Sequence, residues 1–166
     1  MLLKVHQLPD PVLKKPALSV HPNDPHLESL INSMLATMYH YPRCVGLAAP
    51  QVGKSLRVIV VDASRVDKPG SRHGRLALLN PTIAHRRHPR LLREGCLSIP
   101  DYTGNVLRHD RVEVSGLDRK GRPMKISAHG FEAVVFQHEV DHLDGKLFLD
   151  RVSSLETDVF RRKNYG

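Results

Sequence analysis

The chain has 166 residues, a formal net charge of +8, 40% hydrophobic residues and two cysteines. This length predicts a single domain over residues 1–166 with one adequate core. Two cysteines are too few for a disulfide scaffold, and no apolar run approaches membrane-spanning length. Met1–Pro9 is too short and too interrupted for a signal peptide, so we expect a cytosolic protein.

The first predicted element is a helix with Asp24 as its N-cap and Pro25 at its first helical position. An apolar stripe at helical spacing follows and is closed by Pro42: Leu27, Leu30, Ile31, Met34, Leu35 and Met38. A buried strand is predicted over 57–62, then a polar loop over 64–75 and a second strand over 76–79.

The stretch between Pro81 and Glu94 is rich in arginine and histidine, and we expect it to form a basic loop. A strand at 111–114 alternates apolar and polar residues, and a turn at 118–121 leads to a partner strand near 124–126. A last helix is expected after Ser153 or Ser154, carrying Arg161, Arg162 and Lys163. Strands followed by a late helix predict an α+β fold.

The most informative segment is His138-Glu139-Val140-Asp141-His142, within a proline-free stretch that runs from His129 and for which Gly145 is a plausible stop. Residues four apart lie on one face of a helix, so His138 and His142 can bind one metal ion together. Glu139 would lie beside this metal, where a carboxylate can take a proton from water. The alternative is a core helix with two satisfied histidines, but burying these polar groups without a partner would be costly.

A hydrolytic metal site usually needs a third protein ligand. A metzincin is excluded because Phe148 occupies the place of its third histidine, and a gluzincin would have to use Glu156. Cys96 is the better candidate, because its thiolate binds zinc or iron strongly and its neighbour Gly95 permits close approach of the backbone.

Three segments resemble the signature motifs of the peptide deformylase family. They are Gly46-Leu47-Ala48-Ala49-Pro50-Gln51, Glu94-Gly95-Cys96-Leu97-Ser98 and Gln137-His138-Glu139-Val140-Asp141-His142. Each motif alone is weak, but the three occur in the order of the family and at about its spacing. The resemblance implies small mixed or antiparallel sheets packed around a central helix that carries HExxH, with a C-terminal helix.

The resemblance also implies a reaction, the hydrolytic removal of the formyl group from N-formyl-methionyl nascent peptides with release of formate. Cys96, His138 and His142 would bind one divalent metal ion, Fe²⁺ in the cell, with Zn²⁺, Ni²⁺ or Co²⁺ as alternatives. Glu139 would act as general base and then as general acid. Gln51 and the backbone N–H of Leu97 would stabilise the oxyanion.

Substrate contacts follow from the same resemblance. The peptide backbone would lie against the protein as an added strand. The residues expected to bind substrate are Val45, Gly46, Gly95, Val134 and Val135. Formyl-methionine initiation points to the bacterial cytoplasm or to an organelle.

One residue departs from the family pattern. Cys44 stands where the first motif normally has glycine, two residues before Gly46. We expect a small local shift to accommodate it. A sharper hypothesis is that Cys44 and Cys96 can form a disulfide in the metal-free protein, which would displace the metal.

The positive charge suggests attraction to ribosomal RNA, because deformylation acts on nascent chains. The candidate faces are the Arg86–Arg93 loop and the basic C-terminal helix. We expect a monomer that binds neither membrane nor DNA. The alternative functions are a metalloprotease of another clan and a non-enzymatic RNA- or ribosome-binding protein with a structural metal.

Overall fold

The computed structural model describes residues 1–163 and has an α+β fold, as the sequence predicts. Its α-helices are α1 (Leu27–His40) and α2 (Phe131–Leu143). Its strands are β1 (Gly46–Ala48), β2 (Val58–Val61), β3 (Leu76–Cys96), β4 (Ile99–Leu117), β5 (Pro123–His129) and β6 (Val159–Arg161). Short 3₁₀ turns complete it: η1 (Pro11–Lys14), η2 (Ala49–Val52), η3 (Ala63–Arg65) and η4 (Phe148–Asp150). Within the described residues, neither α-helix has the length and apolar character needed to cross a membrane.

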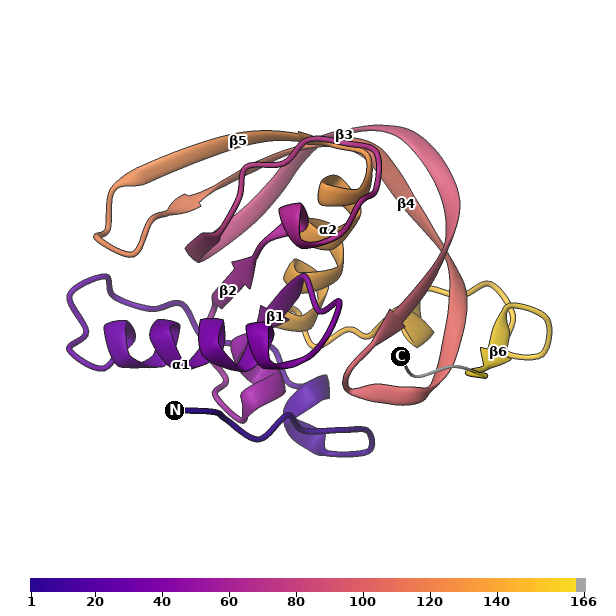
Figure 1. The fold of residues 1–166 in the computed structure, drawn as a ribbon, viewed down its shortest axis with the longest axis horizontal. Helices are drawn as coiled ribbons and strands as arrows, with labels where there is room; N and C mark the ends of the chain where they lie inside the picture. The colour runs from indigo at the N-terminus through magenta and orange to yellow at the C-terminus, as the bar shows by residue number, and fades with distance from the viewer. Residues whose placement is uncertain (164–166) are drawn as a thin grey trace.

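The strands form one antiparallel sheet in the order β1-β2-β3-β4-β5, and β6 pairs with β4. The long β3–β4 ribbon arches over α2, which lies near the centre of the molecule (Figure 1). Alternate residues of β4 and β5, such as Val112 and Ile126, pack on α2 residues such as Val135 and Phe136. Burial of this apolar surface fixes α2, and with it the histidines that it carries.

Two glycines set the ends of α2. Gly130 precedes the helix with a φ of 66°, and a Cβ there would lie 2.5 Å from the carbonyl oxygen of Pro69. Gly145, the predicted stop, has a φ of 74° and follows the helix after Asp144. Both positions favour glycine because the left-handed region is costly for other residues.

Helix α1 begins later than predicted. Asp24 and Pro25 lie in the preceding turn, where the Asp24 carboxylate accepts a hydrogen bond from the backbone N–H of His26 at 2.9 Å. The first helical residue is Leu27, and the helix ends at His40, before Pro42 as expected. Asp24 and Pro25 thus belong to an Asx-type turn before the helix, whereas the capping pattern predicted them as its N-cap and first residue.

The helix expected after Ser153 is absent from the described residues, and this prediction is wrong. Residues 151–158 form turns, and Val159–Arg161 form strand β6 instead. Phe160 pairs with Thr103 of β4, and its ring lies 3.6 Å from the Arg93 guanidinium. This segment therefore pairs with the open edge of β4, and this pairing outweighs its helical propensity.

The basic loop expected between Pro81 and Glu94 is also wrong, because this stretch is part of β3. It pairs with β4 almost continuously, for example Arg90 with Arg108 and Leu92 with Val106. Its outer residues are exposed and polar, so the apolar alternation that reveals a strand is missing. β-Bulges interrupt the pairing between Leu79 and Thr82 and between Ala84 and Arg87.

Candidate metal centre and active site

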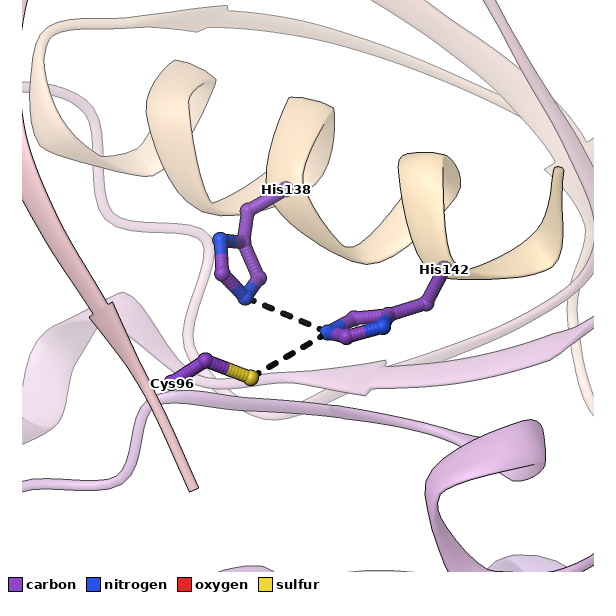
Figure 2. A group of neighbouring side chains, drawn as sticks. All are labelled: Cys96, His138 and His142. Atoms are coloured by element: carbon purple, nitrogen blue, oxygen red, sulfur yellow. Dashed lines mark hydrogen bonds between the residues drawn. The ribbon is translucent and has the colours of Figure 1, made fainter. Parts of the chain in front are cut away.

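Three predicted metal ligands meet beneath the β3–β4 ribbon. His138 and His142 project from the same face of α2 toward Cys96 at the end of β3 (Figure 2). The Nε2 atoms of the two histidines are 3.2 Å apart, and the Cys96 Sγ lies 3.4 Å from His142 Nε2. The three donor atoms all lie within 4.8 Å of one another.

This donor set fits a tetrahedral metal ion. Ligands of tetrahedral zinc lie about 3.4 Å apart for two nitrogens and about 3.6 Å apart for nitrogen and sulfur, from bond lengths of about 2.0–2.1 and 2.3 Å. Two of the three observed separations, 3.2 and 3.4 Å, are close to these values, and the third, between Cys96 and His138, is within 4.8 Å. Burial lowers the pKa of His142 well below its usual value, which favours the neutral imidazole that a metal requires.

A buried ionic network orients His138. Its Nδ1 lies 2.8 Å from the carboxylate of Glu94, which leaves Nε2 to face Cys96 and His142. Burial opposes ionisation of Glu94, but hydrogen bonds from Arg108 and His138 outweigh it and lower its pKa to about 2. Glu94 is therefore ionised at neutral pH and can hold the ring in one orientation.

Arg108 joins this carboxylate to the HExxH helix. It donates two hydrogen bonds to Glu94, of 2.6 and 2.9 Å, and one of 2.6 Å to Asp141. Arg151 donates two further bonds to Asp141, of 3.1 and 2.8 Å. Arg108 and Arg151 were not predicted from the sequence, although Asp141, a carboxylate on the HExxH helix, indicated that a basic partner was needed.

Glu139 lies in the wall of the same site. Its side chain is buried, and its Oε1 has no hydrogen-bond partner among residues 1–163. Burial raises its pKa to about 7. A carboxyl group with this pKa is populated in both protonation states near neutral pH, which suits alternating acceptance and donation of a proton.

Gln51 and Leu97 lie next to the cysteine ligand. The Gln51 amide donates to Ser98 Oγ at 3.1 Å and to Cys96 Sγ at 3.4 Å, while its oxygen accepts from the Ala48 N–H at 3.0 Å. Leu97 and Ser98 form the two-residue turn between β3 and β4, where Cys96 pairs with Ile99. The first and second motifs are thus joined through a side-chain amide.

Gly46 opens β1 directly beside Glu139. A Cβ at this position would lie 2.6 Å from Glu139 Oε2, so only glycine leaves the carboxylate in place. Of the other residues expected to bind substrate, Val134 and Val135 are buried on α2, and Val45 packs against the core that contains Val135. Gly95 faces Thr103 and Arg162. The contacts that these five residues make with substrate stay predictions.

Cys44 is accommodated without left-handed backbone, which the structure places at Arg43 instead, with a φ of 63°. The Cys44 thiol donates to the Gly46 carbonyl at 3.3 Å, and the Arg65 guanidinium donates to the Cys44 carbonyl. Burial, aided by the charge of Glu139, raises the pKa of this thiol to about 12. Both cysteines are free thiols in the structure, and the disulfide stays a hypothesis.

Comparison with known proteins places this site in a family. The polypeptide deformylase family matches residues 2–158. A peptide deformylase of Syntrophobacter fumaroxidans is 46% identical over 162 residues, which cover 98% of this chain and 93% of the relative. The chain belongs to the polypeptide deformylase family.

Solved structures of deformylases agree in fold. A crystal structure of a peptide deformylase from Legionella pneumophila superposes with a TM-score of 0.85 at 41% identity, covering 94% of this chain and 89% of that one. One from Synechococcus elongatus, in complex with actinonin, gives 0.82 at 42% identity, with coverage of 93% and 80%. Deformylases are metal-dependent hydrolases, and the grouping of Cys96, His138 and His142 agrees with this chemistry.

Proposed function

We propose that this enzyme removes the formyl group from the N-terminal formyl-methionine of nascent polypeptides and releases formate. The observation that supports this most directly is the meeting of three motifs in one buried site. Gln51 of the first and Cys96 of the second lie against each other, and Cys96 lies 3.4 Å from His142 of the third. A protease of another HExxH clan needs neither the first nor the second motif.

Cys96, His138 and His142 would hold one divalent metal ion, which when bound acts as a Lewis acid and makes water a nucleophile at neutral pH. Thiolate and imidazole ligands accept Fe²⁺, Zn²⁺, Ni²⁺ and Co²⁺, and we propose Fe²⁺ in the cell. Glu94 keeps the His138 ring oriented through Nδ1, so Nε2 stays available as a ligand.

Glu139 moves the proton. With a pKa raised to about 7, its carboxylate accepts a proton as water attacks the formyl carbon. The same group then gives this proton to the amine nitrogen as the C–N bond breaks, which leaves formate and a free N-terminus. The absence of a Cβ at Gly46 keeps the Glu139 carboxylate in place during both steps.

Gln51 and Leu97 stabilise the negative oxygen that develops during attack. The Gln51 amide is fixed by its bonds to Ala48 and Ser98, and the Leu97 N–H lies in the turn beside Cys96. Donors that are already oriented lower the barrier because little reorganisation is needed as the charge forms. Val45, Gly46 and Gly95 would contact the peptide, with Val134 and Val135 near the methionine side chain.

We propose a single catalytic domain over residues 1–166, monomeric, acting in the bacterial cytoplasm. The charge of +8 supports contact with ribosomal RNA, through the basic part of β3 or the C-terminal segment. Cosedimentation with ribosomes at physiological salt tests the contact, and sedimentation unchanged by glutamate at Arg161, Arg162 and Lys163 would exclude the C-terminal face.

The function is tested by comparing formylated and unformylated peptides of the same sequence. A deformylase releases formate from the first and leaves all internal bonds intact, as mass spectrometry of the products will show. Internal cleavage of both peptides would identify a protease instead. A folded protein that binds metal and modifies neither peptide would support the non-enzymatic alternative.

A further inference from the structure

A row of basic residues crosses the outer face of the sheet, away from α2. Arg87 of β3 is in register with Arg111 of β4, and Arg111 is in register with His129 of β5. All three residues are exposed. Directly opposed residues project from the same face, with Cβ atoms about 4.5–5.5 Å apart. The neighbouring Val112 and Ala128 point the other way, into the core against α2.

This arrangement costs stability unless an anion joins it. Like charges at directly opposed positions destabilise an antiparallel pair. Within residues 1–163, neither Arg87 nor Arg111 has an ion pair or a side-chain hydrogen bond. The other three arginines of β3 differ. Arg90 pairs with Asp110 at 3.0 Å, Arg93 donates to Asn105 at 3.1 Å, and Arg86 donates to the Ile83 carbonyl at 3.2 Å.

The sheet is hollowed at this row. The polar residues in the lining of a recess of about 370 Å³ are His85, Arg87, Arg111, Ser127 and His129, together with Glu113; Val112 and Ala128 also border it. The one carboxylate in this lining, that of Glu113, lies 3.2 Å from the Lys125 ammonium.

A β-bulge shapes the recess. The register shifts between Ala84 and Arg87, and His85 and His88 have left-handed φ values of 53° and 57°. Bulges re-aim side chains and are frequent beside functional sites. Here the bulge places His85 and Arg87 around the same hollow.

We propose that Arg87, Arg111 and His129 form a binding site for phosphate groups of an RNA backbone. The guanidinium fork matches phosphate oxygens in bidentate geometry, and two forks on adjacent strands can hold one phosphate or two neighbouring ones. The net charge of +8 adds long-range attraction for a polyanion. Because the row lies on the face opposite α2, bound RNA leaves the metal centre open. Only the choice of ribosomal RNA as the natural partner rests on the proposed function.

The test measures binding of a fluorescently labelled single-stranded RNA to the metallated full chain by anisotropy across a salt series. Arg87→Gln/Arg111→Gln is compared with Lys4→Gln/Lys120→Gln, which removes the same charge from exposed positions outside the recess. Loss of two phosphate contacts should lower the slope of log K against log salt by about 1.4, which is roughly 25-fold weaker binding at 0.1 M salt. Lys4→Gln/Lys120→Gln should bind the RNA nearly as tightly as the wild type does.

One further variant and one further ligand complete the test. Arg87→Lys/Arg111→Lys keeps the charge but loses the forks, and it should restore the salt slope with only part of the affinity. Equal weakening of RNA binding in Arg87→Gln/Arg111→Gln and in Lys4→Gln/Lys120→Gln would overturn the proposal, since binding would then follow net charge alone. Binding of inorganic phosphate without measurable binding of RNA would also overturn it.

Formate release is measured on every variant as an independent control. It should be unchanged in Arg87→Gln/Arg111→Gln, because neither arginine lies in the catalytic site. The midpoint of thermal unfolding should not fall either, because the substitutions relieve a like-charge contact. Intact RNA binding in a chain without deformylase activity would refute the proposed function while leaving this site in place.

Discussion

Replacing Arg108 with methionine should destabilise the enzyme and loosen its metal centre. Arg108 is 3% exposed, and its guanidinium makes three short hydrogen bonds, two to Glu94 and one to Asp141. Methionine fills much of the volume of the arginine stem but leaves both carboxylates without this cation. Removal of one partner from a buried ion pair costs about 3–5 kcal/mol.

The structure places the expected value near the lower end of that range. Asp141 keeps its two bonds from Arg151, and Glu94 keeps the imidazole of His138 at 2.8 Å. We therefore expect a loss of about 3 kcal/mol in the free energy of unfolding. For a chain of this size, this corresponds to a fall of roughly 6–12 °C in the thermal midpoint.

Urea denaturation of the metal-free protein provides the measurement, because binding energy of the metal then makes no contribution. Arg90→Met is the matched control, since Arg90 lies directly opposite Arg108 but pairs with Asp110 in an exposed position. Exposed ion pairs contribute about 0–1 kcal/mol. Equal midpoints for the two variants would refute the assignment of Arg108 as the centre of the network. Glu94→Gln should also weaken metal affinity by about 10–100-fold, because the His138 ring loses the carboxylate that orients it.

Other predictions concern catalysis, acid stability and the metal. Gly46→Ala should lower kcat/KM by roughly 100-fold with little change in the thermal midpoint, because the new Cβ displaces the Glu139 carboxylate. A large loss of stability instead would mean that this glycine is structural. Gln51→Ala should lower kcat by about 10²–10³-fold in steady-state assays, and an unchanged kcat would exclude it from the oxyanion site. The pKa of Glu94, lowered to about 2 from 4.5, gives the folded state fewer bound protons than the unfolded state below pH 4.5. About 3 kcal/mol of stability should therefore be present above pH 4.5 and lost as the pH falls to 2, which denaturant titrations of the metal-free protein at pH 3 and 6 will detect. Chelation should abolish activity and lower the thermal midpoint, and Fe²⁺ or Ni²⁺ should restore both; retained activity in chelated, metal-free protein would contradict a metal enzyme.

The grouping of the three candidate metal ligands could be predicted from sequence because the pattern that points to them is local. His138 and His142 are four residues apart on one helix, and Cys96 lies in a short motif with glycine beside it. Residue type and spacing therefore point to the same atoms that the structure brings together. The short strand β2 could be predicted equally well, because its four residues are all apolar and buried.

The supporting network could not be predicted in the same way. Arg108 reaches residues 14 and 33 positions away, Glu94 and Asp141, and no local pattern links them. The length of β3 could not be predicted from sequence because its outer half is exposed and mostly polar. This half is a strand because it pairs with β4, and not because its side chains are buried. Strand β6 depends on the free edge of β4, a property of the folded sheet that its own three residues do not carry.

The most direct test of the central claim is formate release from formyl-Met-Ala-Ser by protein purified anaerobically with Fe²⁺ or Ni²⁺. The wild type should release formate, and Glu139→Ala and Cys96→Ala should abolish release while remaining folded. This result would establish deformylation at the Cys96–His138–His142 centre and show that Cys44 is compatible with activity. No release from a folded, fully metallated wild type, or release that survives both substitutions, would contradict the account.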